Sequence, residues 1–153
     1  MRISVKIVLR CPDKSTGTRL RKLGHKINDD VIYQSAAPLD QTTYPLLSKA
    51  AEYGKHPSYK LNTWFRVKYS ETNQTVSICF WSSTDYLEVR ERTLRDLMNE
   101  VTQLTGLTTI EGAIIKSGRG WIMDSDGCWR YDDENEVETI IGFRNYRSYC
   151  NMY

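Results

Sequence analysis

The stretch from Asn62 to Gly106 constrains the fold most, because it alternates like a β-hairpin and then changes to helical spacing. Its alternating apolar residues are Phe65, Val67 and Tyr69, followed by Val76, Ile78 and Phe80. The polar segment 71–74 between them predicts a turn. If Ser70 pairs with Thr75, every one of these apolar side chains lies on one face of the hairpin. A slip of one residue would break that match.

The same register predicts an unusual second face of the hairpin. It carries Trp64, Arg66 and Lys68 opposite Trp81, Cys79 and Ser77. Two tryptophans beside two cations could form a platform on which the bases of a single-stranded nucleic acid stack. The alternative is that a second helix, near residues 43–53, covers the tryptophans. Trp64, Arg66, Lys68 and Trp81 are therefore candidate binding residues.

A long amphipathic helix is expected to follow the hairpin at about residues 84–105. Ser82 and Asp85 have the spacing of a capping box. Leucine, methionine and valine then recur at helical spacing, which makes one apolar stripe. Gly106 is a natural end, because glycine accepts the left-handed backbone that follows many helices.

The remaining pattern predicts an α+β fold. Strands are expected at 1–10, 31–33, 109–116, 121–124, 128–131 and 137–146, and a short helix at about 43–53. The strands at 121–124 and 128–131 flank Asp126-Gly127, and Asp-Gly is a strong signal for a hairpin turn. The first strand should have one buried face and one solvated face. The sum is a mainly antiparallel sheet of about five to seven strands with the long and the short helix packed on it. For 153 residues, a single domain covering 1–153 is the default.

The N-terminal region is strongly basic, since residues 1–26 contain eight Lys or Arg residues and one Asp. Pro12 and Gly17 interrupt regular structure and predict a loop over 11–26. That loop is either a mobile solvated segment or an arm that binds nucleic acid or an acidic protein partner. The candidate binding residues in it are Lys14, Arg19, Arg21, Lys22 and Lys26.

Further candidate binding residues lie near the C-terminus. Arg119 stands between two glycines, where its guanidinium could meet a phosphate or a carboxylate. The last ten residues mix arginine with tyrosine, a combination favoured in contacts with bases and with proteins. The candidates there are Arg144, Tyr146, Arg147 and Tyr149. The acidic run 132–138 lacks EF-hand spacing, which favours a solvated loop over a cation site.

Several classes of protein are excluded. The four cysteines are scattered, without a C-x-x-C pair, and there are two histidines, so no zinc site is expected. The cysteines are expected to be reduced and structural. No apolar run approaches the roughly 20 residues that span a bilayer. No signal-peptide pattern opens the chain, so we expect a cytoplasmic protein that does not engage a membrane.

No catalytic constellation is visible, since His25, His56 and Cys11 lie in no familiar arrangement. We expect no cofactor and a non-catalytic binding protein, most simply a small inhibitor or regulator of a protein partner such as a nucleic-acid-processing or host-defence complex. In broad style the chain resembles the accessory inhibitors carried by phages and mobile elements, which would act in the host cytoplasm. The alternatives are a single-stranded nucleic-acid-binding module and a small enzyme acting on a phosphate-containing substrate.

Overall fold

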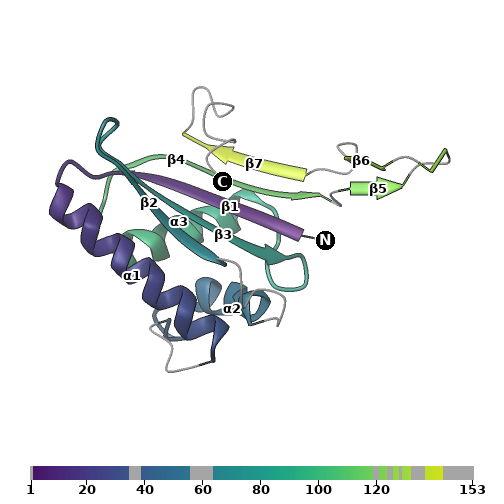
Figure 1. Ribbon diagram of the computed structural model, residues 1–153, viewed down its shortest axis with the longest axis horizontal. Coiled ribbons are helices and arrows are strands. Elements are labelled where there is room, and N and C mark those ends of the chain that lie inside the picture. The colour runs from purple at the N-terminus through teal and green to yellow at the C-terminus, as the bar shows by residue number, and fades with distance from the viewer. Residues whose placement is uncertain are drawn as a thin grey trace.

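The fold is α+β, as the sequence predicts. The structure is a computed structural model that describes residues 2–34, 39–55, 64–118, 121–123, 126–127, 129–131 and 137–142. Its centre is a five-stranded antiparallel sheet with the strand order β2-β3-β1-β4-β7. In Figure 1, α1 lies beside β2 at one edge of this sheet, and β7 forms the opposite edge.

The strands of the large sheet are β1 (Arg2–Arg10), β2 (Phe65–Ser70), β3 (Thr75–Ser83), β4 (Ile110–Gly118) and β7 (Val137–Ile141). The helices are α1 (Lys14–Ile32), α2 (Pro45–Gly54) and α3 (Glu91–Thr105). A separate two-stranded pair consists of β5 (Trp121–Met123) and β6 (Trp129–Tyr131). These two strands are the hairpin expected around the Asp-Gly turn.

The hairpin of β2 and β3 has the predicted register. Ser70 faces Thr75, and the apolar residues pair as Phe65 with Phe80, Val67 with Ile78 and Tyr69 with Val76. Residues 71–74 form the turn, and Gln74 adopts a left-handed backbone with φ 52°. The apolar face packs into one core with the helices. Alternation alone therefore determined both the register and the buried side of this hairpin.

The basic segment 11–26 is not a loop, which corrects the prediction made from Pro12 and Gly17. Residues 14–26 are the first part of α1, which continues to Ile32, so Val31 and Ile32 are helical and do not form the strand expected at 31–33. Asp13 caps the helix, since its carboxylate accepts from the backbone N–H of Ser15 at 3.1 Å and from the hydroxyl of Thr16 at 2.6 Å. These hydrogen bonds lower the pKa of Asp13. The cap offsets the weak helix propensity of Gly17, and packing of the apolar side of α1 in the core supports the rest of the helix.

The long helix begins later than predicted. α3 starts at Glu91, and the residues after β3 form turns in which the N–H groups of Tyr86 and Leu87 donate to the carbonyl of Ser83. The proposed capping box fails because Ser82 is buried and its hydroxyl donates to the carbonyl of Ala50. The predicted end is confirmed, since Gly106 has φ 75°.

The short helix α2 takes its N-terminal cap from another helix. Its own N-cap residue, Tyr44, makes no side-chain cap hydrogen bond. Instead the carboxylate of Glu100 in α3 accepts from the backbone N–H of Leu46 at 3.1 Å and from that of Leu47 at 2.9 Å. Burial raises the pKa of Glu100 more than these two donors lower it. The cap joins α2 to α3 across 53 residues of sequence.

Strand β1 is buried on both faces, which corrects the expectation of one solvated face. Ile3, Val5, Ile7 and Leu9 belong to the core shared with the helices. On the reverse face, Lys6 and Val8 are 0% exposed, and Cys79 of β3 is 1% exposed. The centre of the reverse face is therefore not an open docking surface.

Candidate functional site

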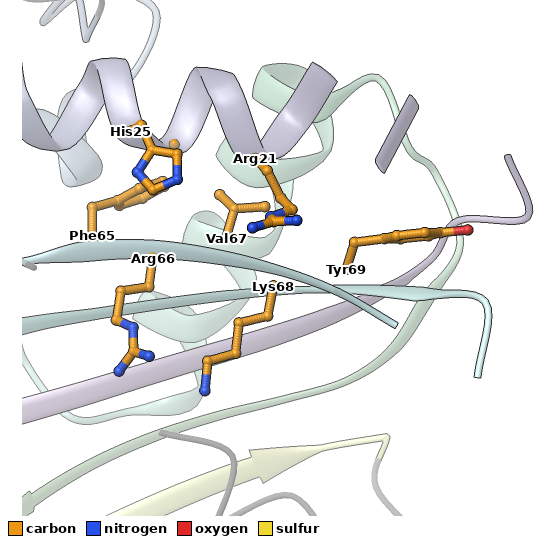
Figure 2. A pocket seen from close by; sticks show the side chains of 8 residues that line it. Arg21, His25, Phe65, Arg66, Val67, Lys68 and Tyr69 are labelled. Atoms are coloured by element: carbon orange, nitrogen blue, oxygen red, sulfur yellow. The ribbon is translucent and has the colours of Figure 1, made fainter. Parts of the chain in front are cut away.

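A basic groove runs between α1 and the edge strand β2 (Figure 2). Its volume is about 520 Å³, and its lining residues are Arg21, Gly24, His25, Phe65, Arg66, Val67, Lys68 and Tyr69. Figure 2 shows Arg21 and His25 extending from α1 towards β2, whereas Arg66 and Lys68 point to the other side of β2. The groove thus follows the outer edge of β2 and is reached by side chains from both faces of the sheet.

Two glycines allow α1 to approach β2 closely. A Cβ atom on Gly24 would lie 2.5 Å from Cγ2 of Val67, and one on Gly17 would overlap the ring of Tyr69. Each glycine inside a helix costs about 1 kcal/mol relative to alanine. Here the two positions face the strand, so the small residues set the distance between the helix and the strand edge.

Asn28 fixes α1 to the beginning of β2. Its side-chain oxygen accepts from the backbone N–H of Trp64 at 2.6 Å and from that of Phe65 at 2.9 Å. The N–H of Phe65 is therefore directed away from β3. Because successive N–H groups of a strand point to opposite edges, those of Val67 and Tyr69 also point outward, into the groove.

The groove is electropositive. Arg21, Arg66 and Lys68 are cations at neutral pH, and none of the eight lining residues is a carboxylate. Within the described ranges, Arg21 and Arg66 have no carboxylate within ion-pair distance. Tyr69 adds no negative charge, because desolvation above all, together with Cys11, Glu71 and Asp13, raises its pKa above the ordinary value of 10.0.

The structure separates the basic residues predicted for the N-terminal arm. All five lie on the exposed face of α1, but Arg21 is the one that lines the groove. Lys14 lies 3.9 Å from Glu71 of the hairpin turn. The other three, Arg19, Lys22 and Lys26, are exposed and do not line the groove.

The predicted pair of tryptophans does not form a platform. Trp64 is 0% exposed and packs against Gly54 of α2, where an added Cβ would lie 2.6 Å from the indole ring. Its Nε1–H donates to the carbonyl of Trp81 at 2.7 Å. The alternative, that the short helix covers it, is therefore right for Trp64. The register that placed it on the reverse face fails because Trp64 precedes the first paired residue of β2.

Trp81 is half-buried and lies beneath a cation. The guanidinium carbon of Arg2 is 3.5 Å from the centroid of its ring, within the range of a cation–π contact. One face of this indole is therefore already covered by the protein's own arginine. Arg66 and Lys68 keep the predicted orientation but serve the groove rather than a tryptophan surface.

Several candidates lie outside the described residues. They are Arg119, Arg144, Tyr146, Arg147, Tyr149, His56, Cys128 and Cys150, together with the acidic run at 132–136. The binding roles predicted for the arginines and tyrosines among them stay predictions.

Sequence reasoning missed the partnership between α1 and the edge of β2. It named His25 as a catalytic candidate and did not place it in one groove with Arg66. A signal was present in the sequence: Gly17, Leu20, Gly24, Ile27 and Val31 recur at helical spacing. That stripe becomes visible only when glycine is counted as a contact residue instead of a helix breaker.

Two cysteines fall inside the described residues, and both are buried and free. Burial raises the pKa of the Cys79 thiol to about 11. The thiol is therefore protonated at neutral pH and is not an activated nucleophile. In the part of the chain that the structure describes, no group of three or more His, Cys, Asp or Glu residues could hold a metal ion.

Comparison of the chain with protein-family models, curated proteins and solved structures gives no match. Among the described residues, no helix is long and apolar enough to cross a membrane.

Proposed function

We propose that this protein is a non-catalytic regulator or inhibitor that binds an acidic segment of a protein partner in the groove between α1 and β2. One observation carries the proposal: three cations and one histidine surround a strand edge without a carboxylate among the lining residues. Opposite charge across an interface speeds association and selects partners.

A polypeptide suits this groove better than a nucleic acid does. Backbone N–H groups directed into a groove match the spacing of another polypeptide chain. Two aromatic residues at the beginning of β2 are unavailable for stacking, since Phe65 is 1% exposed and Trp64 is buried. The net charge of +2 for the whole chain is modest for a nucleic-acid-binding protein.

The first test measures binding of labelled poly-glutamate by fluorescence anisotropy at low salt, with a single-stranded DNA oligonucleotide as the competing class of ligand. Poly-glutamate should bind, and its affinity should fall as salt rises. The triple variant Arg21→Ala, Arg66→Ala and Lys68→Ala should weaken binding by about tenfold, as expected for three partly exposed charge pairs.

The matched control is Arg19→Ala, Lys22→Ala and Lys26→Ala, which removes the same charge from the part of α1 outside the groove. Its affinity should stay within about twofold of the wild type. Equal weakening by both triple variants would show a diffuse charge effect and no site. Tighter binding of the oligonucleotide, lost in the groove variant, would favour the nucleic-acid-binding alternative. No binding of poly-glutamate at low salt would overturn the proposal.

A further inference from the structure

We infer that the partner segment binds as an additional β-strand on the outer edge of β2, and that acidic and apolar residues alternate along it. The inference rests on the proposed function and specifies its geometry. In this arrangement the backbone of the added strand pairs with that of Val67 and Tyr69. The side chains on one face of the added strand contact Arg66 and Lys68 of β2. Those on its other face contact the side chains of α1 that line the groove.

The edge of β2 is available for such pairing. β2 is the last strand in the order of the sheet, and β3 is its hydrogen-bonded neighbour. The N–H groups of Phe65, Val67 and Tyr69 share the outward edge, and Asn28 accepts the one from Phe65. No described residue accepts from the other two N–H groups. Unpaired edge groups are a template for another extended chain.

The side chains around the edge indicate the sequence of the added strand. In a sheet, side chains that point to the same face lie next to each other across neighbouring strands. One set of side chains on the added strand would lie beside Arg66 and Lys68, which favours Glu or Asp there. The other set would lie beside Val67 under α1, which favours apolar residues there. Arg21 on α1 lies above this side of the groove, where it could pair with a further carboxylate of the added strand.

A second copy of this protein is a poor occupant of the same edge. If two β2 strands paired, Arg66 and Lys68 of each copy would lie against the same cations of the other. Like charges opposite each other in a sheet are destabilising. Charges on an edge strand oppose self-pairing in many proteins, and here the same charges select an acidic strand.

The test uses a short labelled peptide in which valine and glutamate alternate, with the folded wild-type protein. A second peptide of the same sequence carries N-methyl groups on those residues whose N–H would face β2. Methylation leaves all charges and side chains in place but removes the backbone donors. We expect the methylated peptide to bind about threefold more weakly for each hydrogen bond lost. Because the protein is unchanged, a folding defect cannot imitate this result.

The matched readout is amide hydrogen exchange of the protein, resolved by residue. On binding of the unmethylated peptide, the N–H groups of Val67 and Tyr69 should gain protection. Those of Arg66 and Lys68, which point towards β3, should change little. A peptide with the same composition arranged as a valine block and a glutamate block is the control for net charge, and it should bind more weakly.

The outcomes separate this inference from the proposed function. Equal affinity of the methylated and unmethylated peptides, with binding still lost in the Arg21, Arg66 and Lys68 variant, would keep an acidic ligand in the groove but overturn strand addition. Unchanged exchange at Val67 and Tyr69 would also overturn it. If the alternating peptide and poly-glutamate both fail to bind, the proposed function falls together with this inference. A concentration-dependent dimer that protects Val67 and Tyr69 without peptide would identify a second copy as the occupant.

Discussion

Helices α1 and α3 both contribute to the core on the same face of the sheet, but they differ in how they pack and in what they present outward. α3 packs through large side chains, with Leu94, Leu97 and Val101 at 0% exposure. α1 approaches β2 through Gly17 and Gly24. The difference is one of distance, because a leucine stripe holds a helix away from the sheet whereas glycine allows contact with the strand itself.

The exposed faces of the two helices differ as well. Residues 14–32 contain five Lys or Arg residues and two Asp, whereas residues 91–105 contain two Arg and three acidic residues. On α3, Arg95 lies 2.8 Å from Glu91 one turn away. On α1, Arg21 has no such partner among the described residues. α3 thus combines a stripe of large buried side chains with an ion pair on its exposed face. α1 contacts β2 through small residues, and its exposed face near the groove carries unbalanced positive charge.

The largest effect is expected from the leucine stripe. Leu97→Ala should lower the free energy of unfolding by about 2–5 kcal/mol, because it leaves a cavity where a fully buried side chain stood. Urea denaturation measures the change, and Gln103→Ala, on the exposed face of the same helix, is the control. Affinity of the folded protein for poly-glutamate should not change. A loss below that of the control would show that α3 is not the main structural helix.

An intermediate effect is expected where α1 meets β2. Gly24→Ala should lower the free energy of unfolding by about 1–2 kcal/mol, because the overlap with Val67 exceeds the gain in helix propensity. In a Val67→Ala background the loss should shrink, since Cγ2 of the valine is the nearest atom. A double-mutant cycle in urea measures this coupling. Additive changes would contradict the argument that glycine permits close approach at this point.

The smallest effect is expected for the pH dependence of stability, through Glu100 of α3, whose carboxylate caps α2. The raised pKa of Glu100 means that the folded state binds its proton more tightly than the unfolded state does. Its stabilising contribution is full below the unfolded pKa and is lost as the pH rises through the raised folded value. The free energy of unfolding of Glu100→Gln should therefore increase relative to that of the wild type as pH rises from acid to neutral.

Denaturation at a series of pH values measures this difference. Asp85→Asn, at an exposed carboxylate with no ion pair among the described residues, is the control for a simple change of net charge. A difference between Glu100→Gln and the wild type that does not vary with pH would contradict the raised pKa. The opposite slope would show that the two backbone donors at Leu46 and Leu47 outweigh burial.

The sequence predicted best where the signal was local and periodic. The β2–β3 hairpin came out in its full register because an alternating pattern admits one buried face. Strand β1, the end of α3 at Gly106 and the Asp-Gly hairpin followed from similarly local rules. The α+β class followed from their sum.

The candidate site was predicted in part. Arg21, Arg66 and Lys68 were named as binding residues, but as members of a flexible arm and of a tryptophan platform. α1 was missed because its contact stripe contains glycine, whose intrinsic propensity argues against a helix. Trp64 was misplaced because alternation was extended one residue beyond the paired part of the strand.

By itself the sequence determined the paired strands, the ends of several elements and the concentration of positive charge near the N-terminus. Tertiary structure alone decided that this charge lies on a helix, that the helix packs over the face of the edge strand β2, and that α2 buries Trp64. The physical reason is the separation in sequence between the residues that make each contact. Periodicity records which side of an element is buried, whereas the choice of neighbour depends on contacts between residues far apart in the chain, such as Asn28 with Phe65 and Glu100 with Leu47.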